Sequence, residues 1–400
     1  MFVEIIIALI LGILAGTFTG LIPGIHVNLI SLMVLGASGY FLGFIETITV
    51  SIFIVSMAIT HTFMDSIPGI FLGAPDSDMV LGVLPGHRML LDGEGYQAVK
   101  LTVIGSFFGL ILSVSLIPLL IPVVTIAYAF LKGIMAYVLI GVVLFMIWKE
   151  QKKLAALFQF LLAGCLGLIV VNFPQLKSPL FPMLSGLFGT ATLLVSLNNA
   201  VTIPAQDLTR KLWIKKSTAV KAVGASVFSG GSVALLPGLG SAQAGIMGNY
   251  LTGDLGDQGF LILIGGINTV NMVVSLLTFY ALNKARNGAI VVVKEIMELI
   301  SFSQLGIFLA VALIVGSIAA ILTLFFTKKF SQFITKVNYK WLCISIITFI
   351  SILVFYFSGI YGFLVLIVST AVGIIPPIIG VKRSHSMGCL LLPVILWFLL

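Results

Sequence analysis

Apolar runs long enough to cross a lipid bilayer recur along the whole of this 400-residue chain. A transmembrane helix needs about 20 consecutive, mostly apolar residues. Only 8% of the residues are charged, whereas charged residues make up about 25% of a typical soluble domain. No polar stretch is long enough to form a separate soluble domain. The sequence therefore predicts a single all-α integral membrane unit that crosses the cytoplasmic membrane several times.

We expect about ten transmembrane helices. They fall at residues 45–64, 97–120, 123–148, 154–172, 180–197, 258–282, 303–327, 341–357, 360–380 and 386–400. Two further apolar segments, 2–42 and 219–251, carry Pro-Gly in their middle. Proline lacks an amide hydrogen and glycine allows unusual dihedral angles, so the pair ends one helix and lets another begin. Each segment is predicted to form a re-entrant hairpin, with a kinked full-length helix as the alternative.

The basic residues, which give the chain a net charge of +8, predict its topology rather than a nucleic-acid partner. They form four clusters in short loops: Lys149, Lys152 and Lys153; Arg210, Lys211, Lys215, Lys216 and Lys221; Lys328, Lys329, Lys336 and Lys340; and Lys382 and Arg383. Short basic loops typically lie in the cytoplasm. If all four clusters lie inside, segment 219–251 must enter and leave on the same side. Five spans then separate the two Pro-Gly segments, so segment 2–42 enters from the opposite face.

This parity predicts two inverted-topology repeats, residues 1–200 and 201–400, each with one hairpin and five spans. Aligning the two Pro-Gly pairs places Gly12, Gly16 and Gly20 on Ser226, Gly230 and Ala234. Small residues at every fourth position allow helices to pack closely. Inverted repeats with interrupted segments in matching places are typical of secondary transporters, which bind substrate between the repeats near the middle of the membrane.

Acidic residues follow the first hairpin, in the stretch from Ile59 to Leu90. This stretch is too apolar for a solvated loop and contains three prolines, so we expect it to be partly embedded. Carboxylates at such depth indicate ion or proton handling. Asp65, Asp76 and Asp78 are therefore candidate ion-coupling residues, for Na⁺ or H⁺. The alternative is that Asp76 and Asp78 cap helices at the membrane interface, and a structural role of this kind is also the alternative for Asp65.

Uncharged amides occupy the second half, where Asn268 and Asn271 lie three residues apart on one helix face. Their side chains can coordinate a cation through oxygen or donate hydrogen bonds to a carboxylate, or they can hold two helices together. Of the histidines, His26 and His61 lie near this region and either couple protons or pack as hydrogen-bonded residues. The predicted substrate site comprises Pro23, Gly24, Asn28, Pro68, Gly69, Pro237, Gly238, Ser241, Gln243, Asn268 and Asn271.

Signatures of enzymes and metal sites are absent from the sequence. It contains no Walker A motif, no H-E-x-x-H and no nucleophile elbow with evident His and Asp partners. Cys165, Cys343 and Cys389 are far apart and lack the spacing of metal ligands. We therefore expect no enzymatic activity, no catalytic or metal-binding residues and no cofactor besides a coupling ion. Glu4 occupies the place of a basic n-region, which favours a retained membrane segment over a signal peptide.

At its Pro-Gly segments the chain resembles the TctA family, the large membrane subunit of tripartite tricarboxylate transporters. The family's Gly-x3-Gly-x3-Gly…Pro-Gly pattern is matched by Gly12, Gly16, Gly20, Pro23 and Gly24, and again by Gly230, Pro237 and Gly238. The family's Ile-Pro-Gly loop is similar to Ile67-Pro68-Gly69, although residues 70–73 precede Ala74-Pro75 here. A counterpart of this loop is missing from the second half, which has Lys284 and Arg286 in the corresponding stretch.

The resemblance implies a secondary carrier, driven by an ion gradient, for small organic anions such as di- or tricarboxylates. It also implies two protein partners, a small membrane subunit and an extracytoplasmic binding protein. A homodimer is one oligomeric state compatible with this interpretation. The alternative transport function is translocation of a polyprenyl phosphate or another lipid phosphate, because broken Pro-Gly hairpins also suit such carriers. A membrane-embedded enzyme and a structural scaffold are the alternatives outside transport.

Overall fold

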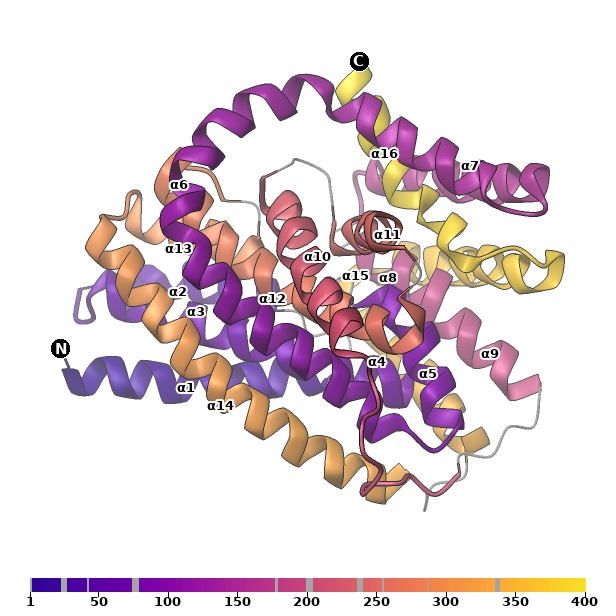
Figure 1. Ribbon diagram of the computed structural model, residues 1–400, viewed down its shortest axis with the longest axis horizontal. Coiled ribbons are helices and arrows are strands. Elements are labelled where there is room, and N and C mark those ends of the chain that lie inside the picture. The colour runs from indigo at the N-terminus through magenta and orange to yellow at the C-terminus, as the bar shows by residue number, and fades with distance from the viewer. Residues whose placement is uncertain are drawn as a thin grey trace.

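The structure is a computed structural model of the chain. It describes all residues except 1, 23–26, 42, 74–78, 177–178, 199–203, 236–239, 254, 286 and 335–338. The described residues form helices and connecting loops, without a strand (Figure 1). The first half contains α1 (Phe2–Leu21), α2 (Val27–Phe41), α3 (Thr47–Met64), α4 (Ser66–Leu72), α5 (Val83–Leu91), α6 (Gly95–Trp148), α7 (Lys153–Val171), α8 (Leu180–Leu184) and α9 (Ala191–Asn198). The second half contains α10 (Lys216–Leu235), α11 (Ser241–Thr252), α12 (Gly256–Leu282), α13 (Gly288–Met297), α14 (Phe302–Ile334), α15 (Tyr339–Ile379) and α16 (Gly388–Leu399).

Eight helices of the described chain are long and apolar enough to cross a membrane. They are α1, α3 continued by α4, the first part of α6, α7, α10, α12, α14 and most of α15. This finding confirms the predicted class, an all-α membrane protein. The number of ten spans and the re-entrant nature of the Pro-Gly segments stay predictions. The chain forms a helix on each side of both Pro-Gly pairs, which themselves lie outside the described residues.

Two pairs of predicted spans are each joined into one long element. Spans 97–120 and 123–148 both fall within α6, which contains Pro118 and Pro122 and turns sharply along its length in Figure 1. Proline removes a helical hydrogen bond and bends the helix without ending it. Spans 341–357 and 360–380 both fall within α15, where Gly359 has a φ of 63° that interrupts the helix. The predicted boundaries thus coincide with bends instead of loops.

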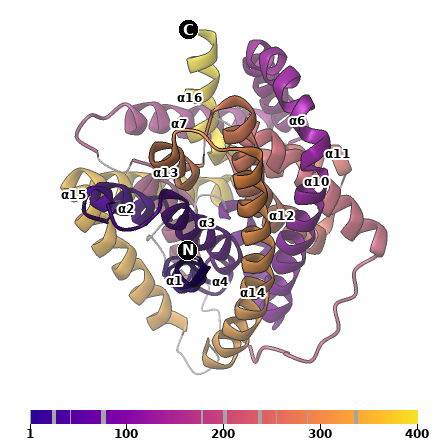
Figure 2. The same ribbon diagram turned by 90° about the vertical axis from the view of Figure 1, so that its left-hand side faces the viewer.

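Helix α1 packs along α3 through its small residues. A methyl group on Gly12 would lie 2.6 Å from the Phe53 oxygen, and one on Gly16 would lie 2.4 Å from the Met57 oxygen. A methyl on Gly20 would lie 2.4 Å from Cβ of Met64. The contacts advance along both helices together, so α1 and α3 run parallel. Figure 2 shows α1 almost end-on, beside α3, α4 and α14.

Helix α10 packs along α12 in the same manner. A methyl on Gly266 would lie 2.3 Å from Oγ of Ser226, and one on Gly230 would lie 2.8 Å from Cβ of Val270. These two helices are therefore parallel as well. On another face α12 contacts α6, where the Ser106 hydroxyl donates to the Gly265 oxygen at 2.9 Å. As a result, α12 is surrounded by protein over most of its length.

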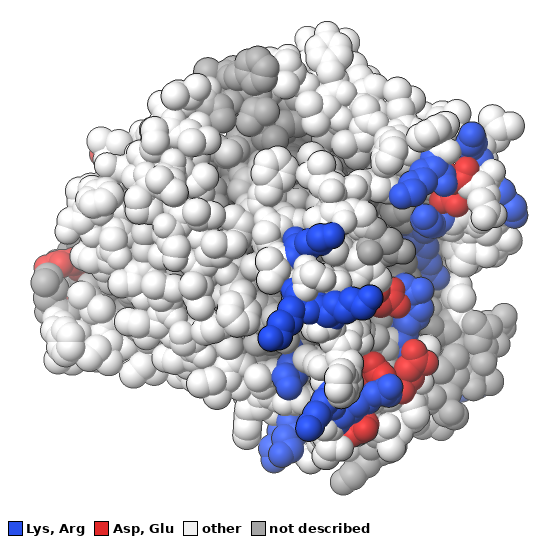
Figure 3. Space-filling model, in the orientation of Figure 1, with Lys and Arg blue, Asp and Glu red and all other residues white. Residues whose placement is uncertain are grey.

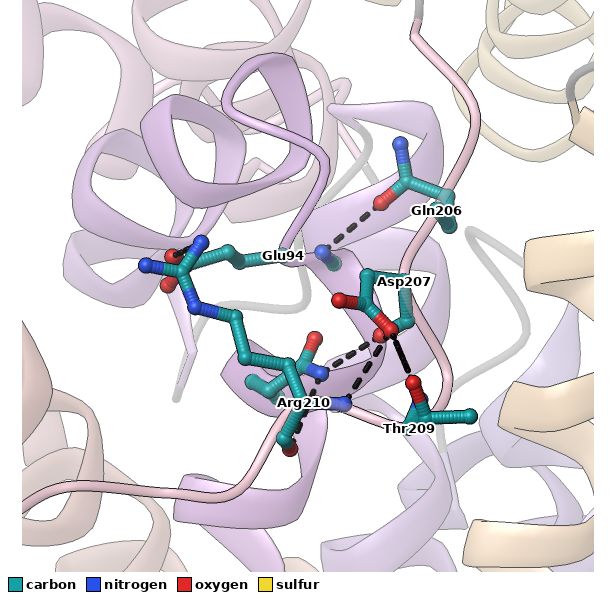
Figure 4. Close-up of polar contacts among 7 residues, drawn as sticks. Glu94, Gln206, Asp207, Thr209 and Arg210 are labelled. Atoms are coloured by element: carbon teal, nitrogen blue, oxygen red, sulfur yellow. Dashed lines mark hydrogen bonds and ion pairs between the residues drawn. The ribbon is translucent and has the colours of Figure 1, made fainter.

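The segment that connects the two halves is held to the start of α6 by hydrogen bonds and an ion pair (Figure 4). The Gly95 amide donates to Oε1 of Gln206 at 2.8 Å, and the Asp207 amide donates to the Gly93 oxygen at 2.9 Å. Arg210 forms an ion pair with Glu94 at 2.5 Å. These contacts place the segment leading into α10 at the same end of the molecule as the start of α6.

Basic residues gather at this end. Lys and Arg concentrate on the right-hand side of the face shown in Figure 3, whereas the left-hand side of that face carries almost none. Two contacts join the first basic cluster to the ends of α11 and α15. Lys149 lies 5.1 Å from the ring centre of Tyr250, at the end of α11, and the Lys152 ammonium donates to the Ile379 oxygen at 2.8 Å. The positive-inside rule predicts that this end faces the cytoplasm.

A second group of helices lies on the right in Figure 1 and comprises α7, α8, α9, α15 and α16. Small residues again set the contacts. A methyl on Gly167 of α7 would lie 1.9 Å from the Cys389 oxygen of α16, and one on Gly373 of α15 would lie 2.2 Å from the Leu187 oxygen. Leu187 belongs to a π-helical turn, Ser185–Thr190, that connects α8 and α9. The C-terminal helices of each half therefore pack against those of the other half.

Candidate functional site

The first and second halves meet through a buried carboxylate and a buried amide. The Nδ2 group of Asn268 on α12 donates a hydrogen bond of 2.6 Å to Oδ2 of Asp65. Asp65 is 2% exposed and Asn268 is 3% exposed. A short hydrogen bond to a carboxylate is among the stronger polar interactions in proteins. The two residues are 203 positions apart in the sequence, so helix packing brings them together.

Asp65 occupies the junction between α3 and α4. Its own amide bonds to the His61 oxygen and thereby closes the last turn of α3. Pro68 stands in the first turn of α4, where a helix does not need its missing amide hydrogen. Gly69 follows, and both residues are buried. The Ile-Pro-Gly motif therefore restarts the helix directly after the carboxylate.

A second polar contact lies one residue along α12. Oγ1 of Thr62 is 3.0 Å from Oγ1 of Thr269. Because the Thr62 hydroxyl donates its hydrogen to the Ile59 oxygen at 2.8 Å, the Thr269 hydroxyl is the donor between the two threonines. These threonines were not singled out from the sequence. Their signal is their spacing, with Thr62 one turn before Asp65 and Thr269 directly after Asn268.

A third contact attaches α1 to the same region. Nδ1 of His61 lies 3.0 Å from Oγ1 of Thr19, whose hydroxyl donates to the Gly16 oxygen at 3.2 Å. His61 and Thr19 are both buried. The predicted alternative for His61, a packed and hydrogen-bonded histidine, agrees with this geometry. Its role in proton coupling stays a prediction.

The chemistry of this cluster suits a small cation or a proton. A charged group in an apolar environment carries a large desolvation cost unless it is paired or hydrogen-bonded. Carboxylate, amide and hydroxyl oxygens also supply the kind of oxygen ligands that hard cations prefer. The described residues contain no group of three His, Cys, Asp or Glu side chains arranged to hold a metal ion. The candidate site therefore comprises one acid surrounded by neutral polar groups.

The other predicted site residues have different positions. Asn271 lies one turn beyond Asn268 on α12 and is 7% exposed. Ser241 is buried at the start of α11. Asn28 packs against the start of α13, because a methyl on Gly288 would lie 2.5 Å from Cγ of Asn28. The structure thus joins Asp65 directly to Asn268, whereas the substrate-binding role of these three stays a prediction.

Several predicted residues lie outside the described part of the chain. They are Pro23, Gly24, His26, Asp76, Asp78, Pro237, Gly238 and Arg286, together with the side chain of Gln243. Their assignment to the site remains as the sequence predicts it.

Comparisons with known proteins agree with the resemblance. Residues 6–388 match the model of the tripartite tricarboxylate transporter TctA family. The chain is also 30% identical, over 98% of both sequences, to a protein of Methanocaldococcus jannaschii that is described as uncharacterized. No solved structure matches the chain. Because the family match covers nearly the whole sequence, this multi-pass membrane protein belongs to the tripartite tricarboxylate transporter TctA family.

Proposed function

We propose that the protein is a secondary transporter that takes up a small organic anion, such as a di- or tricarboxylate, across the cytoplasmic membrane. An inward gradient of Na⁺ or H⁺ would drive the uptake. The observation that carries the proposal is the buried hydrogen bond between Asp65 and Asn268, which links the two halves of a TctA-family chain. An ionisable side chain at membrane depth is a functional site by default.

Helix directions support an inverted-repeat mechanism for this transporter. α1 runs parallel to α3, and α5 packs beside α4, since a methyl on Gly86 would lie 2.5 Å from Ile70. The chain then reaches Gly93, whose oxygen accepts a hydrogen bond from the Asp207 amide in the segment that leads into α10. α10 therefore starts at the end where α3 finishes, and α1 starts at the end where α3 begins. Opposed entry of the two Pro-Gly segments is the arrangement expected of alternating access around a central site.

In this mechanism Asp65 holds the coupling ion. With its carboxylate neutralised by a proton or by Na⁺, the cost of the buried charge falls, and the two halves can move around the site with less penalty. Asn268 positions the carboxylate through its amide hydrogens. Its oxygen can coordinate the ion or accept a hydrogen bond. The anion would bind next to the ion, near the two Pro-Gly pairs, so that each ligand offsets the charge of the other.

The family supports the proposed partners. TctA proteins are components of tripartite transporters, so we expect a small membrane subunit and an extracytoplasmic binding protein that delivers the anion. No enzymatic reaction is proposed, and Na⁺ or H⁺ is the only inorganic ligand in the mechanism.

The test is uptake of radiolabelled citrate and succinate into proteoliposomes that contain the purified protein and its two partner proteins. We expect accumulation under an inward Na⁺ or pH gradient and none after the gradient is collapsed. Asp65→Asn keeps the size of the side chain and removes its charge, so gradient-driven uptake should fall to background. Asp92→Asn is the matched control, because Asp92 is exposed at the end of α5.

Two outcomes would contradict the proposal. Gradient-driven uptake by Asp65→Asn at the wild-type rate would remove Asp65 from ion coupling. Flipping of a polyprenyl phosphate by the same liposomes, without uptake of either carboxylate, would favour lipid-phosphate translocation over anion uptake.

A further inference from the structure

One arginine in the second helix group is held inward, and no described carboxylate forms an ion pair with it. Arg383 is the first residue of a short 3₁₀ turn, Arg383–Met387, and is only partly exposed. Its Nη1 group donates to the hydroxyl of Thr192 on α9. Among the described residues its hydrogen bond goes to this hydroxyl, and arginine carries five N–H groups, so donors are left for an anion.

The neighbouring contacts hold this turn in place. Nε2 of His385 lies within hydrogen-bond distance of Oε2 of Glu150, at 3.0 Å, and Nε2 of Gln159 donates to the Ser386 hydroxyl at 2.9 Å. The Thr192 hydroxyl donates its own hydrogen to the Phe188 oxygen, so its lone pair faces Arg383 as an acceptor. Both ends of the Arg383–Thr192 contact are therefore fixed by further hydrogen bonds. A guanidinium held in this way is pre-organised for a ligand.

The position of Arg383 connects the second helix group to the Ile-Pro-Gly segment. Leu193, next to Thr192, lies beside the end of α4, since a methyl on Gly73 would be 3.2 Å from Cδ2 of Leu193. His87 on α5 is close enough for the positive charge of Arg383 to act on it. The pKa of His87 is lowered, chiefly by burial and also by the positive charge of Arg383, whereas the hydrogen bond with the Ile70 oxygen raises it. Arg383 therefore lies close to α5 as well as to α9.

We propose that Arg383, held by Thr192, binds a carboxylate group of the transported anion at the cytoplasmic side of the site, between α4 and α9. This inference rests on the proposed function and adds a specificity residue to it. Arginine binds a carboxylate through two parallel hydrogen bonds, which a lysine cannot reproduce. Lys382, next to Arg383, belongs to the basic clusters that the sequence predicts to face the cytoplasm, and this is the side where an imported anion would leave.

The test measures the kinetics of citrate uptake into proteoliposomes for variants of this contact. Arg383→Gln should raise KM for citrate about tenfold or more, because a hydrogen bond between charged groups is lost. Arg383→Lys should restore only part of this loss. Thr192→Val should raise KM less, about threefold, since it removes one neutral partner. Lys382→Gln is the matched control, because Lys382 is the adjacent, exposed cation, and its KM should equal that of the wild type.

Controls separate this inference from its alternatives. Wild-type protein without any citrate uptake would overturn the proposed function, whereas wild-type uptake with an unchanged KM in Arg383→Gln would overturn this inference alone. A purely structural role predicts a lower thermal midpoint for Arg383→Gln and Thr192→Val at constant KM, and that result would also overturn it. If the rise in KM disappears in liposomes that lack anionic lipid, an anionic lipid headgroup is the ligand and the inference is wrong.

Discussion

The pair α1–α3 and the pair α10–α12 have the same packing but different chemistry. A methyl on Gly16 would meet Cβ of Thr60, and a methyl on Gly230 would meet Cβ of Val270. Matching these contacts places Thr60 on Val270, and the following residues then match His61 with Asn271 and Asp65 with Ser275. The first pair therefore carries the ionisable residues, whereas the equivalent positions of the second pair carry neutral polar ones.

This difference shows how two similar frameworks can share one site. If both pairs carried a carboxylate, two like charges would face each other in an apolar environment, which is strongly unfavourable. With the acid on one side and an amide on the other, the single charge is hydrogen-bonded across the junction of the halves. Substitutions in the two pairs, and at the contacts between them, test this division.

The largest effect is expected at the amide that supports the acid. Asn268→Ala removes the donor of the 2.6 Å bond and leaves the Asp65 carboxylate with one partner fewer. The loss of a buried hydrogen bond to a charged group should lower the free energy of unfolding by about 2–3 kcal/mol. Thermal unfolding in detergent measures this change. Asn271→Ala is the matched control on the same helix, and an equal loss in both variants would show that Asp65 does not depend on Asn268.

The next effect tests the shared packing. Gly16→Val and Gly230→Val each introduce a side chain where a methyl already lies within 2.4–2.9 Å of a neighbouring helix. Overpacking of this kind should cost about 1–3 kcal/mol in both variants. Gly224→Val is the control on α10, because a methyl there meets nothing within 4 Å. Similar losses at 16 and 230 with none at 224 are expected in melting curves, and a loss at only one glycine would contradict the equivalence of the two pairs.

The sequence predicted the helices better than it predicted the contacts between them. Apolar runs and small residues at every fourth position placed α1, α3, α10 and α12, because periodicity is a local property of the chain. The bends at Pro118 and Gly359 were read as loops, since a short interruption looks the same in the sequence whether the helix bends or ends.

The site residues could likewise be predicted one by one, whereas the contacts between them could not. Asp65 and Asn268 could be predicted one at a time, because a carboxylate or an amide within an apolar run is unusual by itself. The bond between them could not, and neither could the contact between Thr62 and Thr269, which are 207 residues apart. Arg383 was interpreted only as part of a basic loop. Its inward position depends on α9 and on the fixed turn that follows α15.

A smaller effect is expected at the threonine contact. Thr62→Val and Thr269→Val each remove one partner of the 3.0 Å bond, and each should lower the free energy of unfolding by about 1 kcal/mol. The double variant should cost less than the sum of the two, because both changes break the same bond. A double-mutant cycle by thermal unfolding measures this coupling. Additive losses would mean that the two hydroxyls do not stabilise the crossing of α3 and α12.

The smallest effect is expected at the contacts between the start of α6 and the segment that connects the two halves. The side chains of Glu94 and Arg210 are 18% and 57% exposed, so their ion pair is partly screened by solvent. Arg210→Gln should therefore lower the free energy of unfolding by less than about 1 kcal/mol, and the difference should shrink further in high salt. Gln206→Ala removes the partner of the Gly95 amide, which is shielded from salt, and should cost more than the loss of the ion pair. Melting curves at two salt concentrations separate the contributions. A larger loss for Arg210→Gln than for Gln206→Ala would mean that charge, and not the hydrogen bonds of the connecting segment, holds the second half against α6.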